Sequence, residues 1–155
     1  MAVCNDGDMV RVTNTQFAVA AHVLTYLGGL AEGSTASSAE LAESTGSNAV
    51  YVRRVLGPLR DAGLVRSRPG AFGGWELAQP PQGISLALVW RLINRGDPVL
   101  GIHGPNPQCQ VGQQVHRALV ALDSDVARAV DQELAGHTVA DLLRNVRAPA
   151  GRTRR

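Results

Sequence analysis

Apolar residues recur every three or four positions along most of the chain, which is the spacing of amphipathic helices. The first stripe predicts a helix that is capped by Thr13 or Asn14 and continues to Ala31. Two shorter stripes follow, and the first of them begins at a capping box made by Ser37 and Glu40. The pattern therefore predicts three helices in the first 62 residues.

The second and third stripes have the residue types of a helix-turn-helix. Ala42 is small enough for two helices to approach, Gly46 suits a positive φ in the turn, and Val52 supplies an aliphatic plug for the core. Ser47 is expected to cap the third helix, and Gly63 is expected to follow its last turn. This arrangement is typical of proteins that place one helix in the major groove of DNA.

A β-hairpin is predicted directly after the helix-turn-helix. Leu64–Ser67 and Gly74–Leu77 form two short strand patterns, and the turn residues PGAFGG lie between them. Trp75 alternates with a polar neighbour and is expected in the core. A hairpin in this position is a wing.

The C-terminal half predicts three more helices, separated by a proline-rich break. One begins after Ser85, a long one covers Val111–Leu134, and a last one is capped by Thr138. The long helix carries an apolar stripe with alternating steps of four and three: Val115, Leu119, Leu122, Val126 and Ala129. The predicted fold is mainly α with a small β-wing, a winged helix-turn-helix followed by a long C-terminal dimerisation helix.

These elements divide the chain into four parts. Residues 1–12 are expected to be a flexible arm, and residues 13–83 a winged helix-turn-helix domain that binds DNA. Residues 84–146 would hold a linker helix, a sensor loop and the dimerisation helices, and residues 147–155 a basic disordered tail.

Charge distribution favours the same interpretation. The net charge is only +2, and all 15 basic residues are arginine. Residues 45–75 contain five arginines and one acid, whereas residues 97–141 contain two arginines and six acids. Positive charge thus collects on the helix-turn-helix and wing, as in proteins that bind nucleic acid.

Other functional classes find little support in the sequence. No nucleophile–base constellation and no phosphate-binding loop is present, so the chain is not expected to be an enzyme. No signal peptide opens the sequence and no apolar run reaches transmembrane length, which predicts a cytoplasmic protein without a membrane partner. Two cysteines, Cys4 and Cys109, are too few for a disulfide framework.

Three blocks of sequence carry a family resemblance. They are TNTQFAVAAHVLTYLGGLA, the stretch from SSAELAESTGS through LRDAGLV to GGWELA, and PNPQCQVG before the long helix. Together they span Thr13 to Arg144, nearly the whole chain, which resembles the Rrf2 family of bacterial winged-helix transcription regulators. The resemblance implies a homodimer in which the long helix crosses to the partner.

The predicted partner is double-stranded DNA, bound as a palindromic operator by a regulator that acts as a repressor. Asn48 and Arg53 are expected to read bases, whereas Tyr51 and Arg54 are expected to contact phosphate. Arg68 is expected to reach the minor groove or a phosphate from the wing. The complete set of predicted DNA contacts is Ser38, Ser47, Asn48, Tyr51, Arg53, Arg54, Arg68 and Gly73.

Many Rrf2 members hold an iron–sulfur cluster through three cysteines in the loop before the long helix. Here that loop contains only Cys109, and even with His103 and His116 the region offers three ligands at most. The sequence therefore predicts a cluster-free member with no cofactor and no metal.

Cys109 is instead the candidate sensing residue. The positive end of the long helix would favour its thiolate, although a small buried loop residue is the alternative. The effector would be an oxidant or a small molecule. Two other functions remain open at this point: an iron–sulfur redox regulator, and a winged helix that binds a protein instead of DNA.

Overall fold

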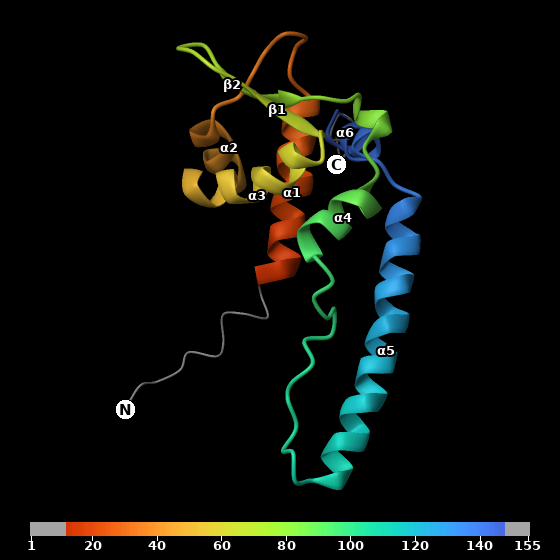
Figure 1. Cartoon of the computed structure of the whole chain (residues 1–155). Helices are drawn as coiled ribbons and strands as arrows, with labels where there is room; N and C mark the ends of the chain where they lie inside the picture. Colours follow the sequence, from red (N-terminus) through yellow and green to blue (C-terminus); the bar gives the residue numbers. More distant parts are fainter. Residues whose placement is uncertain (1–11, 148–155) are drawn as a thin grey trace, which may run out of the picture.

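The computed structural model describes residues 12–147, with side chains for residues 15–146. The predicted arm and tail lie outside these residues, apart from positions 12 and 147. In chain order the elements are α1 (Val12–Gly28), α2 (Ser38–Thr45), α3 (Ala49–Asp61), β1 (Val65–Arg68), β2 (Gly74–Leu77), a 3₁₀ turn (Pro81–Gly83), α4 (Leu86–Asn94), α5 (Gln110–Ala135) and α6 (Val139–Arg147). Figure 1 shows their arrangement.

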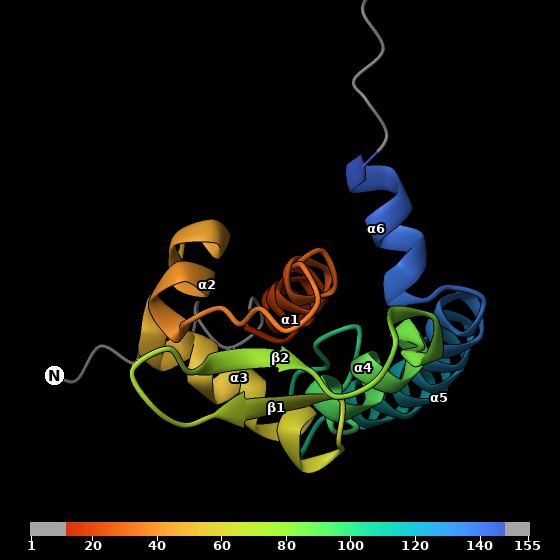
Figure 2. The same cartoon turned by 90° about the horizontal axis from the view of Figure 1, so that it is seen from above.

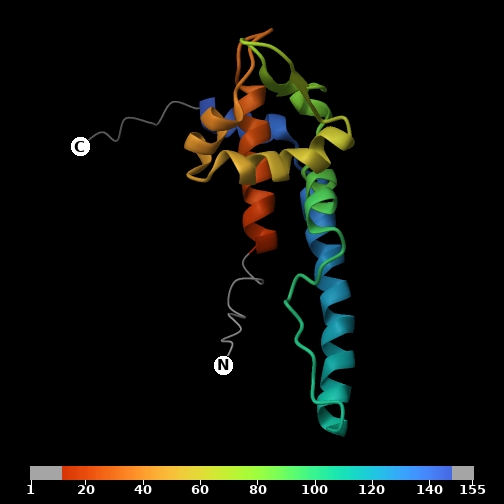
Figure 3. The same cartoon turned by 60° about the vertical axis from the view of Figure 1, so that its left-hand side comes forward.

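Helix α1 is the centre of the fold, because α2, α3, α4, α6 and β2 all contact it. Helix α5 contacts α4 and then extends well beyond the other helices, accompanied only by the loop that follows α4 (Figure 1, Figure 3). After α5 the chain turns back, and α6 packs against α1. No helix within residues 12–147 combines the length and apolarity needed to cross a membrane.

Local sequence signals set several helix ends. Ser37 and Glu40 form the predicted capping box, since each side chain accepts a hydrogen bond from the other residue's backbone N–H. The prediction of Ser47 as the cap of the third helix is wrong: Asn48 occupies that position, and its Oδ1 accepts the N–H of Tyr51 at 2.9 Å. Asn is as good a cap as Ser, so the helix begins one residue later and the free N–H group that the cap satisfies is that of Tyr51.

The first helix also differs from its prediction. It begins at Val12, before either predicted cap, and ends at Gly28 instead of Ala31. A Cβ on Gly28 would lie 2.8 Å from a methyl group of Leu143 on α6. The apolar pattern continues beyond Gly28 although the helix ends there, and periodicity alone does not separate a turn from a helix.

Strands β1 and β2 form an antiparallel pair in which Arg66 faces Glu76 and Ser67 faces Trp75. The first strand lies one residue later than predicted, because it runs from Val65 to Arg68. The segment before α2 adds a further bridge: the backbones of Ala36 and Trp75 exchange two hydrogen bonds of 2.8 and 3.0 Å. The wing is thereby attached to the helix-turn-helix along its edge.

One hydrophobic core joins these elements. Leu24, Leu41, Leu56 and Leu59 from the first three helices are fully buried, and so is Leu64 just before the wing. The same cluster continues through α4 and α6, whose members include Val89 and Val139. The winged helix and the two shorter C-terminal helices therefore fold as one packed body.

The core predicts a stability effect for a single truncation. We expect Leu56→Ala to lower the free energy of unfolding by about 2–5 kcal/mol, because the fully buried side chain would leave a cavity. The matched control is Phe72→Ala, which removes a larger side chain that is 98% exposed and should change stability by less than about 0.5 kcal/mol. Urea unfolding followed by circular dichroism measures both; equal effects would contradict the packing described.

Candidate nucleic-acid interface

The turn between α2 and α3 has the geometry of a helix-turn-helix. Gly46 takes a left-handed conformation with φ 63°, as its position predicts, and the N–H of Ser47 bonds to the carbonyl of Ala42 at 2.9 Å. The hydroxyl groups of Thr45 and Ser47 lie 2.7 Å apart and join the end of α2 to the turn. This turn fixes the direction in which α3 leaves.

Helix α3 has one buried and one exposed face. Its buried residues are Val52, Val55, Leu56 and Leu59. The exposed face carries Asn48, Arg53 and Arg54, together with Val50, whose side chain is 62% exposed. The predicted contact residues of α3 thus lie on the side of the helix that is free to enter a groove.

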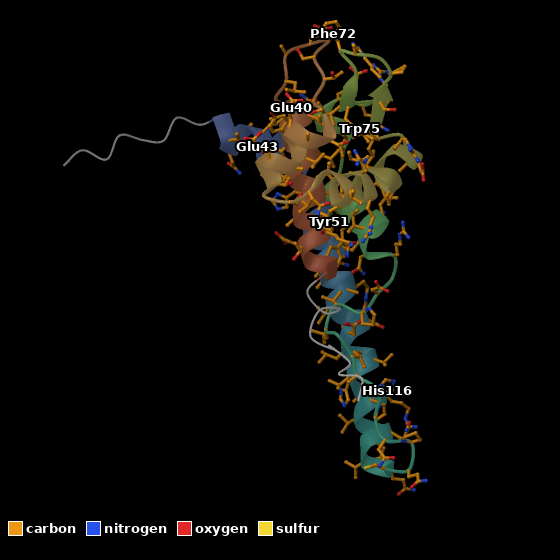
Figure 4. All side chains as sticks on the ribbon, turned by 90° about the vertical axis from the view of Figure 1, so that its left-hand side faces the viewer. Glu40, Glu43, Tyr51, Phe72, Trp75 and His116 are labelled. Carbon is orange, nitrogen blue, oxygen red and sulfur yellow. The ribbon has the colours of Figure 1, made fainter. Side chains whose placement is uncertain are left out.

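Two of the predicted contact residues, Asn48 and Tyr51, also interact with the protein itself. The Oδ1 atom of Asn48 is used by the helix cap, which leaves the amide NH₂ group to donate outward. Tyr51 is half-buried, and this burial raises the pKa of its phenol although Arg54 nearby lowers it. The phenol is therefore a neutral hydroxyl donor at physiological pH; Figure 4 labels Tyr51 on α3.

The cations of this region differ in their partners. Arg60, at the end of α3, pairs with Asp61 at 3.0 Å. Within the described residues, Arg53 and Arg54 take part in no ion pair. The N-terminal half of α3 therefore presents two uncompensated guanidinium groups, which is the arrangement that attracts phosphate.

The wing is attached to the segment before α2 by side chains as well as by its backbone. The indole N–H of Trp75 donates to the hydroxyl of Ser38 at 3.1 Å, and the hydroxyl of Thr35 donates to the carbonyl of Phe72 at 3.3 Å. Ser38, a predicted DNA contact, thus also holds the wing. The half-buried Trp75 packs against the core as predicted.

Glu76 is the residue of this region that sequence reasoning missed. Its carboxylate accepts hydrogen bonds from Nε of Arg66 at 2.6 Å and from Nε of Arg68 at 2.9 Å. These bonds, the Arg66 bond above all, hold the pKa of the Glu76 carboxyl below its usual range although burial opposes them. Arg68, a predicted DNA contact, is therefore already paired, and the alternation of charges along β1 and β2 was the available signal.

Two glycines of the wing, Gly73 and Gly74, are required by the close packing of the hairpin backbone. A Cβ on Gly73 would overlap the carbonyl oxygen of Arg68, and a Cβ on Gly74 would lie 2.7 Å from the carbonyl oxygen of Ala36. The predicted contact at Gly73 thus coincides with a position where the hairpin itself requires glycine. Phe72 beside it points into solvent at the tip of the wing (Figure 4), and no pattern in the sequence singled it out.

Part of the apolar stripe of α5 is left exposed by the rest of the described residues. No residue of α5 is buried, and Val111, Val115 and Leu122 are 68%, 48% and 51% exposed. Leu119 and Val126 are half-buried on the neighbouring side, which faces α4 and the loop before α5. Helix α5 thus has an apolar face that the other elements leave exposed.

Cys109 caps the N-terminus of α5. Its Sγ accepts the N–H of Gly112 at 3.3 Å, and the residue is exposed. This excludes the alternative of a small buried loop residue. His116 in the next turn lies with Nδ1 3.2 Å from the carbonyl of His103, so the loop before α5 is joined to the helix.

The described residues do not form an iron–sulfur site. In residues 15–146, no three His, Cys, Asp or Glu side chains gather closely enough to hold a metal. Cys109 is the single cysteine of that range, and Cys4 lies outside it. A cluster that needs four ligands, mostly thiolate, does not fit this donor set.

These elements define a winged helix-turn-helix protein with an appended long helix. Residues 13–145 match the family model of Rrf2, described as an iron-dependent transcriptional regulator. The chain belongs to the Rrf2 family. It is 33% identical over 134 residues to Bacillus subtilis YwnA, described as an HTH-type transcriptional regulator, covering 86% of this chain and 98% of YwnA.

Solved structures show the same relationship. A transcriptional regulator from Lactobacillus plantarum is 25% identical, with a TM-score of 0.71 over 86% of this chain and 91% of that one. Staphylococcus aureus CymR is 26% identical, with a TM-score of 0.61 over 83% of this chain and 95% of CymR. The protein is thus a DNA-binding transcriptional regulator and not an enzyme.

Proposed function

We propose that the protein acts as a homodimer on a palindromic operator and represses transcription there. The observation that carries the proposal is the pairing of two features. Arg53 and Arg54 stand unpaired on the exposed face of α3, and the exposed apolar stripe of α5 offers a surface to a second copy. Two-fold symmetry would place the two copies of α3, the recognition helices, about 34 Å apart in successive major grooves.

The proposed DNA contacts lie on α3, around the turn before it and on the wing. Arg53 and the free amide of Asn48 read base edges, whereas Arg54 and the neutral phenol of Tyr51 bind phosphate. The remaining proposed contacts lie around the turn and on the wing: Ser38, Ser47, Arg68 and Gly73. Position 73 requires glycine for steric reasons, and the absence of a side chain there would also let the wing approach the DNA backbone closely.

The two regions have separate tasks in this proposal. Residues 13–83 bind DNA, and residues 84–146 join the subunits and sense the effector, in the cytoplasm where the chromosome lies. The loop between α4 and α5 is connected to both helices: the side-chain amide of Asn94, the last residue of α4, donates to the carbonyl of Asp97 at 2.8 Å, and the N–H of Leu100 donates to Asp123 on α5 at 2.7 Å. The two helices are joined directly by Arg91 on α4, which pairs with Asp131 on α5 at 2.6 Å. A change at Cys109 would tilt α4 and α5 and alter the spacing of the recognition helices.

Oxidation of Cys109 is the proposed input. Staphylococcus aureus CymR has a solved oxidised form. Hydrogen peroxide transfers one oxygen atom to a thiol, giving sulfenic acid and releasing water. We expect peroxide to change the operator affinity of the wild-type protein by about 5-fold or more, the lower end of common allosteric couplings. Fluorescence anisotropy of a labelled operator measures the change.

Two cysteine variants test the site of oxidation. Cys109→Ser should abolish the response to peroxide, whereas Cys4→Ser should keep it. A Cys109→Ser protein that responds as the wild type does would remove Cys109 from the sensing role. A wild type that binds equally before and after treatment would end the thiol mechanism and leave a small-molecule effector.

The operator itself tests the proposed function. Rounds of selection from a random duplex pool with the full-length protein, followed by sequencing, should return an inverted repeat with half-sites one helical turn apart. Affinity should fall steeply with salt, because contacts to phosphate release counterions. Enrichment of no sequence, with binding insensitive to salt, would contradict the proposal and favour a winged helix that binds protein.

A further inference from the structure

We propose that Glu76 is a positioning residue for DNA binding: it fixes the guanidinium groups of Arg66 and Arg68 on one face of the wing and cancels one of their two charges. The inference rests on the proposed function, in which the wing contacts the duplex. It adds a role for an acidic residue in an interface otherwise built from cations.

The sheet register places one carboxylate between two guanidinium groups. Arg66 lies directly opposite Glu76 across the strand pair, and Arg68 is two residues along on the same face. The residue opposite Arg68 is Gly74, which has no side chain to occupy that place. Arg68 therefore leans toward Glu76, and its Nε lies 2.9 Å from the same Oε1 atom that Arg66 contacts at 2.6 Å.

Burial differs sharply between the partners. The side chain of Glu76 is 11% exposed, whereas those of Arg66 and Arg68 are 62% and 46% exposed. A buried carboxylate must be paired, so the two arginines cannot both leave it without cost. Both use Nε toward Glu76. The outer N–H groups of Arg66, and the Nη2 group of Arg68, remain available to a phosphate.

A second anchor fixes Arg68. Its Nη1 donates to the carbonyl of Gly33 at 3.2 Å, in the connection between α1 and α2. This connection passes beside the hairpin (Figure 2), where the Ala36 backbone bridges Trp75. The arginines are thus held relative to the helix-turn-helix, and both the direction and the net charge of the wing are set before DNA arrives.

Glu76→Gln tests this role, because glutamine keeps the shape and an acceptor oxygen but removes the negative charge. The wing would then offer one more positive charge per subunit. We expect the slope of log K against log salt concentration to become steeper by about 0.9 per subunit. Affinity for a duplex of shuffled sequence should rise more than affinity for the operator duplex returned by selection. The ratio of operator affinity to shuffled-duplex affinity should therefore fall.

The charge-matched control is Asp61→Asn, which frees Arg60 from a similar ion pair at the C-terminal end of α3. That end points away from a groove entered by the N-terminal half of the helix, so the slope should stay near the wild-type value. Anisotropy of both duplexes between about 50 and 200 mM salt gives each slope. Circular dichroism at each condition confirms that each variant is folded.

The outcomes separate this inference from the proposed function. If the wild type shows no salt-dependent duplex binding, both fail together. If the wild type binds as proposed but Glu76→Gln leaves its slope unchanged, or Asp61→Asn changes it equally, Glu76 has no positioning role. If Glu76→Gln does not fold, Arg68→Gln is the second test. Glu76 neutralises one of the two arginines, and Arg68→Gln removes the positive charge that remains, so the slope should become shallower by about 0.9 per subunit. An unchanged slope would overturn the inference.

Discussion

A Leu122→Asp replacement on α5 is expected to separate the proposed dimer and to weaken binding to a two-half-site operator by about 10²–10⁴-fold. The loss is this large because the second subunit of a dimer binds at the effective concentration set by the first. A monomer keeps every interaction of its own α3 and wing and loses only that advantage. Affinity for a duplex with one half-site should therefore stay unchanged.

The choice of Leu122 follows from the exposed face of α5. Val111, Val115 and Leu122 are separated by steps of four and seven, so they lie along one stripe of the helix. Each is about half exposed or more in the single chain. The N-terminal part of α5 projects past α4 (Figure 3). A carboxylate in the centre of an apolar interface would be buried without a partner.

Val146→Asp is the matched control for this experiment. Val146 is 71% exposed on α6, so a comparable change of charge and size occurs outside the α5 stripe. Sedimentation velocity should find Val146→Asp dimeric and Leu122→Asp monomeric. If Leu122→Asp remains a dimer, the subunits associate through a different surface.

Replacing both Arg53 and Arg54 with alanine should have the second large effect. Arg54 binds phosphate in the proposed complex, so a dimer would lose two phosphate contacts and the slope of log K against log salt should become shallower by about 1.8, or about 0.9 for each phosphate that is no longer neutralised. Arg53 reads a base in the same complex, so discrimination between selected and shuffled duplexes should fall as well. Neither arginine has a partner in an ion pair of the described chain, so stability should change little.

Arg60→Ala provides the comparison on the same helix. Arg60 is paired with Asp61 and lies at the far end of α3, so its removal should leave the slope close to that of the wild type. Anisotropy titrations at several salt concentrations measure all three proteins. A double variant with the wild-type slope would show that another surface neutralises the phosphates.

Much of the fold could be predicted because its signals are local. The Ser37–Glu40 capping box, the left-handed Gly46 and the positive φ of Gly63 each depend on residues within one turn. The strands and the long helix were also predicted, to within one residue at each end. The family resemblance agreed with these elements, and the Rrf2 match confirms it.

The exact ends of two helices could not be predicted. The periodicity of the first helix continues to Ala31, yet the helix ends at Gly28, where Leu143 of α6 packs. Ser47 and Asn48 are both good caps, and the bond between the hydroxyls of Ser47 and Thr45 leaves the cap to Asn48.

The candidate site divides in the same way. The exposed face of α3 could be inferred from its own spacing, because a helix that buries Val52 and Leu59 must expose Arg53 and Arg54. The pairing of Arg68 with Glu76 depends on the register between two strands, and the sequence alone did not reveal it. Predictions for cations on a wing are thus incomplete until the opposite strand is placed.

The mass of the protein–DNA complex decides whether the protein acts as a dimer on its operator. Multi-angle light scattering of the full-length protein, with and without the duplex returned by selection, counts subunits in both states. We expect two chains in the free protein and two chains on one duplex that carries an inverted repeat. A single chain bound to a single half-site, with no cooperative second binding, would contradict the dimeric regulator.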